Sequence, residues 1–157
     1  MPTVWRLTTP AFARRLDGEG SREAGGRWNS PGRGLVYTSS HLSLCVLEVY
    51  VHLPSELRDQ RAEFEAVRIS VPDDMNRTEM TIKQFERLMA SADPLRACRD
   101  AGDRWLAAAA ELVLAAPSVV VPEELNMMLN PAHPRMREVT IVSTRRFRLD
   151  PRLVVSA

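Results

Sequence analysis

A glycine pair followed by an arginine, a tryptophan and an asparagine forms the segment Gly25-Gly26-Arg27-Trp28-Asn29. Two glycines let a backbone bend tightly and approach a ligand closely, and successive N–H groups in such a loop can form a concavity for anions. The arginine guanidinium matches the oxygens of a phosphate, and a tryptophan can stack on a flat ring. The segment indicates a site for a phosphate-bearing aromatic ligand, although a glycine-rich surface turn with a solvated arginine would have the same residues.

Tyr37 and Glu48 are the next candidates for a site. Tyr37 lies ten residues after Arg27 in an expected strand, where it either packs on the sheet or orients a ligand. Glu48 lies between Leu47 and Val49 in an expected helix. Because a carboxylate is rarely buried without a partner, Glu48 is either solvated on the open face of that helix or directed into a cleft.

Two later segments carry a hydroxyl and an imidazole. Ser118 follows Pro117 but lacks the Gly-x-Ser-x-Gly pattern of a nucleophile elbow, so a serine hydrolase is not supported. Its hydroxyl either binds a substrate or ends a helix. The prolines at positions 131 and 134 make a stiff turn around His133, which is either an acid–base group or a turn residue.

Hydrophobic periodicity gives the elements that position these residues. Residues 4–7 and 35–37 are short apolar runs that predict strands, and the apolar–polar alternation of residues 67–71 predicts a third. Apolar residues at steps of three and four across residues 42–53 predict a helix. Its candidate N-caps are the three hydroxyl residues Thr38, Ser39 and Ser40. Residues 17–34, with six glycines, are expected to form a long loop.

The second half of the chain predicts short helices near residues 84–89 and 94–98, and a helix that begins at Asp103 and runs to Ala115. A buried strand is expected at residues 119–121. Two closing strands are expected at residues 138–143 and 146–149. Strands and helices interleave without a regular βαβ alternation. The predicted fold is therefore α+β, one domain over residues 1–157 with a mixed β-sheet core flanked by helices.

The charge balance argues against a nucleic-acid enzyme. The 157 residues carry 21 basic and 20 acidic side chains, a formal charge of +1, whereas proteins that grip a nucleic-acid backbone usually show a clear basic excess. This makes a ribonuclease the weaker hypothesis.

Cysteine content and hydropathy indicate a cytoplasmic protein without a metal centre. Cys45 and Cys98 stand in apolar surroundings outside any CxxC pair, and only three histidines are present, so we expect reduced, buried thiols and no metal site. The N-terminal residues show no signal-peptide pattern. The longest apolar stretch, residues 105–113, is interrupted by Glu111 and is too short to span a bilayer.

Taken in order, these segments resemble the RES domain family, over residues 5–152. The family is named after an arginine, a glutamate and a serine, which match Arg27, Glu48 and Ser118 here. Met127 departs from the pattern, because an aromatic residue often stands there. The matching segments are Arg6, Gly25-Gly26-Arg27-Trp28-Asn29, Tyr37-Thr38-Ser39, Glu48, Gly102-Asp103-Arg104-Trp105-Leu106, Pro117-Ser118 and Asn130-Pro131-Ala132-His133-Pro134.

The resemblance implies a bacterial type II toxin with a fold like that of ADP-ribosyltransferase toxins. Such a toxin cleaves the nicotinamide–ribose bond of NAD and depletes it by phosphorolysis or hydrolysis. The alternatives are an ADP-ribosyltransferase that modifies a host protein and a non-enzymatic interaction module. The implied partner is a cognate Xre-type antitoxin whose helix-turn-helix would carry all DNA binding, and a toxin homodimer within the hetero-oligomer is compatible with this. NAD would be the substrate, and neither a metal nor a membrane is implied.

The same resemblance gives each residue an expected role. Arg27 would grip the pyrophosphate with the backbone of Gly26, Tyr37 would orient the nicotinamide, and Glu48 would stabilise the ribose as it becomes cationic. Ser118 would bind the nicotinamide ribose or the attacking acceptor, and Arg6 would be a second anion contact. The expected NAD-binding set is completed by Trp28 and Asn130.

Overall fold

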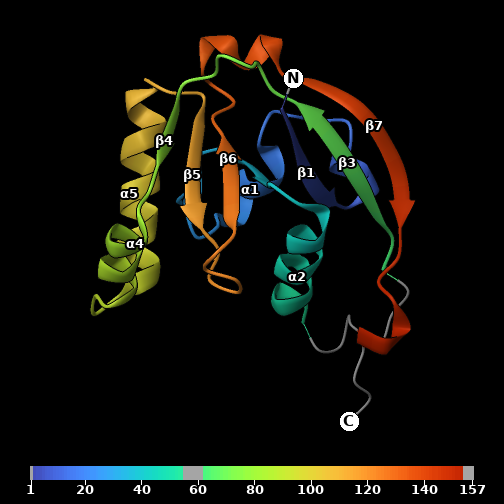
Figure 1. The fold of residues 1–157 in the computed structure, drawn as a ribbon, viewed down its shortest axis with the longest axis horizontal. Coiled ribbons are helices and arrows are strands. Elements are labelled where there is room, and N and C mark those ends of the chain that lie inside the picture. The colour runs from blue at the N-terminus through green and yellow to red at the C-terminus, as the bar shows by residue number, and fades with distance from the viewer. Residues whose placement is uncertain (1, 55–61, 154–157) are drawn as a thin grey trace.

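Residues 2–54 and 62–153 are described by the computed structural model, and they form one seven-stranded sheet in the order β4-β5-β6-β2-β1-β3-β7 (Figure 1). Only the β4–β5 pair is parallel, so the predicted α+β fold with a mixed sheet is confirmed. The strands are β1 Thr3–Thr8, β2 Val36–Ser39, β3 Phe64–Ser70, β4 Arg77–Glu79, β5 Val113–Pro117, β6 Leu125–Leu129 and β7 Thr140–Phe147. The helices are α1 Glu19–Ala24, α2 Leu42–His52, α4 Ile82–Met89 and α5 Pro94–Ala108.

The sheet is weakly joined between β1 and β2. These two strands are aligned at a single residue pair, Trp5 with Ser39, whereas β1 is aligned with β3 along its whole length and β2 with β6 along its whole length. The sheet therefore consists of two halves, β4-β5-β6-β2 and β1-β3-β7, that diverge from each other. This divergence is visible in Figure 1, where α2 lies in front of the join.

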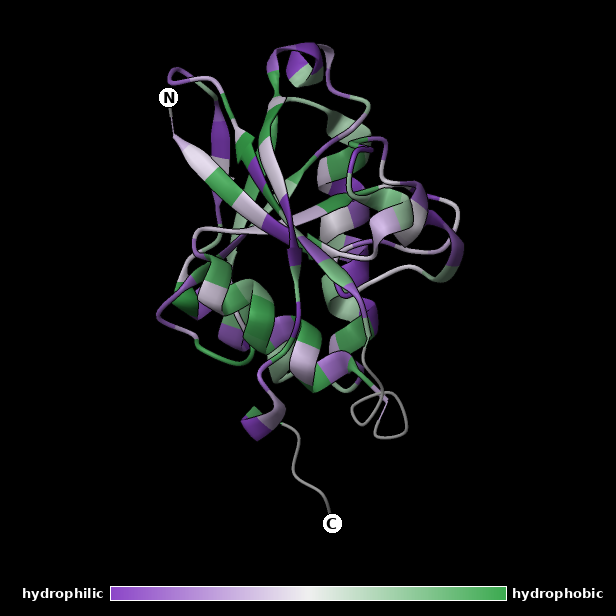
Figure 2. Cartoon of the chain, turned by 90° about the vertical axis from the view of Figure 1, so that its right-hand side faces the viewer, coloured by the Kyte–Doolittle hydropathy of each residue, from purple (hydrophilic) through white to green (hydrophobic). Residues whose placement is uncertain are grey.

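The protein has three apolar clusters, of which the first joins the two halves of the sheet. One cluster lies on a common face of the sheet and includes Val36, Ile69 and Leu129. A second packs α4 and α5 against β5 and β6, and the third packs α2 against β1 and β3. Hydrophobic and hydrophilic residues are interspersed along the strands that face the viewer in Figure 2. No described helix has the length and apolar character that crossing a lipid bilayer requires.

The expected helix from Asp103 to Ala115 is wrong. Helix α5 runs from Pro94 through Asp103 to Ala108 and ends at Ala109, whose φ of 47° is left-handed. The following residues form β5, and every residue of that strand is buried. A strand buried on both faces lacks the polar–apolar alternation of a half-buried strand, so the sequence of β5 does not distinguish it from a buried helix.

Other boundaries also differ from the prediction. Residues 119–121 are not a buried strand, because Val119 is 42% exposed in an irregular segment. The two closing strands are one continuous strand, β7, and the loop of residues 17–34 contains helix α1. The N-cap of α2 is His41 rather than a hydroxyl residue, since Thr38 and Ser39 belong to β2.

Helix α5 clamps the loop that carries the glycine pair. Arg99 Nε donates to the Gly26 carbonyl oxygen over 2.8 Å, and Asp103 Oδ1 accepts from the Ser30 amide over 3.0 Å. Between them, Gly102 lies so close to the loop that a Cβ atom there would stand 1.8 Å from the Trp28 carbonyl oxygen. The glycine is therefore required for the helix and loop to touch.

Gly102→Ala should destabilise the protein by about 1–3 kcal/mol, because the added methyl group forces two backbones apart. Urea unfolding followed by circular dichroism measures this. Gly20→Ala is the matched control, since a Cβ there meets only the Phe12 ring at 3.6 Å, an ordinary contact. Equal stability of the two variants would contradict the clamp.

Candidate active site

A cavity of about 680 Å³ lies at the join between the two halves of the sheet. It is lined by β1, β2, α2, the glycine loop and the segment that follows β5, and it is of the size that small-molecule sites usually have. We call it the split cavity. Six of the residues expected at the site line it: Arg6, Gly26, Arg27, Trp28, Tyr37 and Glu48.

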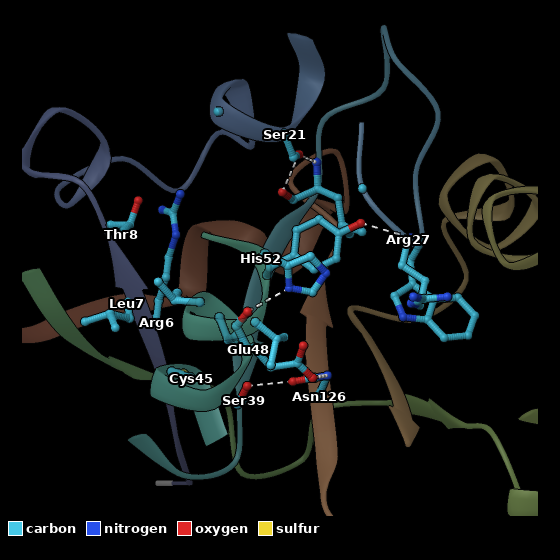
Figure 3. A pocket seen from close by; sticks show the side chains of 18 of the residues that line it. Arg6, Leu7, Thr8, Ser21, Arg27, Ser39, Cys45, Glu48, His52 and Asn126 are labelled. Atoms are coloured by element: carbon cyan, nitrogen blue, oxygen red, sulfur yellow. Dashed lines mark hydrogen bonds between the residues drawn. The ribbon is translucent and has the colours of Figure 1, made fainter. Parts of the chain in front are cut away.

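Glu48 presents a half-buried carboxylate whose two oxygens differ (Figure 3). Oε1 accepts one hydrogen bond from Ser118 Oγ and another from Asn126 Nδ2, each over 2.7 Å. Oε2 has no hydrogen-bond partner among the described residues. One oxygen is thus fixed by the protein, and the other remains available to a ligand.

Ser118 does not line the split cavity, although we expected it to contact the substrate. Its side chain is fully buried, and its Oγ accepts from the backbone amides of Val120 and Val121 over 3.0 and 3.1 Å. Because these amides occupy its lone pairs, its one proton is directed to Glu48. Ser118 therefore acts on the site through Glu48.

Asn126 is a site residue that the sequence analysis missed. Its Oδ1 accepts from Ser39 Oγ over 2.6 Å, which turns its amide nitrogen toward Glu48. Asn126 lines the split cavity from β6. A polar side chain inside the apolar run of residues 125–129 was the signal available for it.

The hydroxyl of Tyr37 supports the glycine loop. It donates to Asn29 Oδ1 over 2.6 Å and accepts from the Trp28 amide over 3.0 Å, and burial raises its pKa above the ordinary value. A Cβ at Gly26 would stand 2.3 Å from this hydroxyl, so only glycine fits beside Tyr37. The ring of Tyr37, rather than its hydroxyl, is what remains for a ligand.

The two arginines line opposite sides of the split cavity in the view of Figure 3. Arg6 Nη1 donates to the backbone oxygens of Phe12 and Arg15 over 3.3 and 2.7 Å, and burial lowers its pKa, against the charge of Asp17. Arg27 makes weak contacts with two sulfur atoms, from Nη1 to Met89 Sδ over 3.8 Å and a side-chain hydrogen bond with Cys98. Arg27 is therefore the freer of the two cations.

The remaining expected residues are engaged in the protein interior. The Trp28 side chain is only 2% exposed and packs in the apolar cluster with Phe85, which leaves no free ring face for stacking. Asn130 lies outside the split cavity. It is buried, donates to the Leu106 carbonyl oxygen over 3.2 Å and accepts from the Ala132 amide over 3.0 Å.

His133 and His52 differ in their position relative to the split cavity. His133 is outside the split cavity and accepts from the Arg135 amide, so it caps a turn. His52, which the sequence analysis did not single out, lines the cavity one turn after Glu48. Its signal was the four-residue spacing from that carboxylate. Within residues 2–54 and 62–153, no group of three or more His, Cys, Asp or Glu side chains is arranged to hold a metal ion.

The fold and the cavity define a mixed-sheet α+β domain that holds one carboxylate between two guanidinium groups. The RES domain family model matches residues 3–150, so the chain belongs to the RES domain family. The predicted family is confirmed.

Several known proteins are similar to this chain. It is 34% identical to the Prs ADP-ribosylating toxin of Sphingobium sp. (strain YBL2), over 99% of this chain and 98% of that one. It is 33% identical to Toxin Res of Yersinia enterocolitica, over 90% of this chain and 92% of that one. A crystal structure of the M. tuberculosis MbcT–MbcA toxin–antitoxin complex shares the fold, with a TM-score of 0.72, 20% identity, and coverage of 97% and 86%. The chain is therefore a RES-domain protein whose relatives, matched over nearly its whole length, are named as toxins.

Ser118→Ala should destabilise the protein by about 1–3 kcal/mol, because it removes a hydrogen bond to a charged group and leaves two amides without their acceptor. Chemical unfolding measures the change. Ser143→Ala on the exposed face of β7 is the control and should be close to neutral. A neutral Ser118→Ala would show that this serine does not fasten Glu48.

Proposed function

We propose that this toxin cleaves the nicotinamide–ribose bond of NAD in the split cavity. The observation that carries the proposal is the Glu48 carboxylate, fixed at Oε1 and open at Oε2. Cleavage of a glycosidic bond passes through an oxocarbenium-like transition state, and a fixed negative charge beside the ribose stabilises it. The relatives named as toxins, one of them ADP-ribosylating, support the same chemistry.

The leaving group simplifies the reaction. Nicotinamide is cationic in NAD and departs as a neutral base with the electron pair of the broken bond, so no general acid is required. The protein has to hold the phosphates, seat the nicotinamide and keep the carboxylate charged. Arg27 with the Gly26 backbone suits the pyrophosphate, and the Tyr37 ring suits the nicotinamide.

The acceptor of the ADP-ribose is water, inorganic phosphate or a protein side chain. Transfer to a host protein is favoured by the Sphingobium relative, whose name describes ADP-ribosylation of Prs. At the mouth of the split cavity, Val51 and Val119 are 45% and 42% exposed. Such apolar side chains at the rim are suited to contact with a protein acceptor.

Purified toxin incubated with NAD, with and without phosphate and with a bacterial lysate, tests the proposal. We expect free nicotinamide in each reaction, and mass spectrometry of the products identifies the acceptor as ADP-ribose, its phosphate ester or a modified protein. Intact NAD in all three reactions would contradict the proposed function.

Glu48→Gln and Arg27→Ala should separate catalysis from binding. Glu48→Gln keeps the shape but removes the charge, so kcat should fall far more than the affinity for NAD changes. Arg27→Ala should chiefly raise KM, by about tenfold to a hundredfold, since one charge-assisted contact contributes about 1.5–3 kcal/mol.

Steady-state kinetics of both variants provides the measurement. Glu86→Gln and Arg146→Ala are matched controls, because both side chains are exposed and outside the split cavity. Unchanged turnover in Glu48→Gln, combined with a loss of affinity, would contradict the role of Glu48.

The proposal includes control by a cognate Xre-type antitoxin in the cytoplasm, where the NAD pool lies. An antitoxin segment with a carboxylate would imitate the pyrophosphate and pair with Arg27, and the DNA contacts would belong to the antitoxin. NAD should therefore weaken antitoxin binding, as measured by titration of the toxin carrying Glu48→Gln, which keeps NAD intact. A ternary complex with undiminished affinity for both ligands would contradict this form of control.

A further inference from the structure

His52 stands beside Glu48 on the wall of the split cavity. It is the last residue of α2 and follows Glu48 by four positions, so the two side chains lie on the same face of the helix. Its side chain is exposed and lines the cavity. In the view of Figure 3 it lies above Glu48, between Arg6 and Arg27.

One hydrogen bond fixes which nitrogen of His52 carries the proton. Nδ1 is 2.7 Å from the carbonyl oxygen of Glu48. A carbonyl oxygen can only accept, so Nδ1 is the donor. The neutral ring therefore has its lone pair on Nε2, which is the atom directed away from the helix backbone.

The proposed reaction needs a group that accepts a proton. When an acceptor that bears an O–H attacks, the C1′–O bond forms, the C1′–N bond breaks, and nicotinamide leaves as a neutral base with the electron pair. The acceptor oxygen must then lose its proton. Nicotinamide does not need that proton in order to leave, so another base takes it, and a positioned side chain does this faster than bulk water.

Most of the ionisable side chains that line the described cavity are unsuited to this. Burial raises the pKa of Tyr37 and of Cys45, the latter to about 11, and both groups donate elsewhere, to Asn29 Oδ1 and to the Trp5 carbonyl oxygen. The two arginines are permanent cations. Glu48 already receives two hydrogen bonds, and its negative charge is needed by the ribose.

We infer that His52 Nε2 is the general base that deprotonates an O–H acceptor, water or a hydroxyl, as it attacks the ribose. This rests on the proposed function. The roles on α2 are then divided: Glu48 stabilises the cationic ribose, and His52, one turn away, receives the proton from the incoming oxygen. An anionic acceptor without a proton to lose does not need His52.

His52→Gln separates this role from a structural one. The hydrogen bond to the Glu48 carbonyl also caps the end of the helix, and a glutamine amide can still donate to that oxygen, but it cannot act as a base. With water as acceptor and saturating NAD, we expect about a hundredfold loss of kcat and little change in KM. His41→Gln is the control, because His41 is exposed and outside the cavity lining.

Azide provides the second arm of the experiment. It is an anion that attacks without releasing a proton, so it should restore nicotinamide release in His52→Gln and yield ADP-ribosyl azide, seen by mass spectrometry. A His52→Gln variant with the wild-type hydrolytic rate would overturn the inference. So would a variant as slow with azide as with water, and so would a wild type that cleaves NAD only with phosphate. A wild type that releases no nicotinamide would instead contradict the proposed function itself.

Discussion

The half-buried charge of Glu48 is the constraint around which this structure is organised. A carboxylate taken partly out of water is costly unless donors replace the lost hydration. Ser118 and Asn126 provide those donors, and each is made a one-way donor to Glu48 by a further bond, from the amides of Val120 and Val121 and from Ser39. The helix that carries Glu48 is thereby tied to β6 and to the segment after β5.

This tie lies where the sheet itself is weakest. Strands β1 and β2 are aligned at one residue pair only, and the cavity occupies the space where they diverge. Helix α2 and its carboxylate, bonded to β6 and to the segment after β5, supply cohesion that the backbone ladder does not. The same arrangement places the Glu48 carboxylate on the wall of the cavity.

The second wall of the cavity is made by close backbone packing. Gly102 lets α5 touch the loop at Trp28, and Gly26 lets that loop lie against the Tyr37 hydroxyl. Arg99 and Asp103 add hydrogen bonds from the same helix. The loop is thus held in place by α5 and by Tyr37. Arg27 lines the cavity from this loop.

The sequence was sufficient to predict those helices and strands whose apolar residues recur at a regular spacing. The helix expected over residues 42–53, observed as α2, and the half-buried strand β3 could be predicted because their apolar residues recur at helical or strand spacing. Strand β5 was missed because it is buried on both faces and carries no alternation. The family resemblance named Ser118 and Asn130 but not the atoms they touch, because hydrogen-bond partners 70 residues away, as for Ser118 and Glu48, are set by tertiary structure. The roles of Asn126 and His52 become apparent only from their positions next to Glu48 in the folded structure.

A crystal structure of the Glu48→Gln variant with NAD bound tests the central claim most directly. The account predicts the pyrophosphate at Arg27, the nicotinamide beside the Tyr37 ring, and the nicotinamide ribose within hydrogen-bond distance of the side chain at position 48. NAD bound elsewhere on the domain, with the split cavity filled by water, would contradict it.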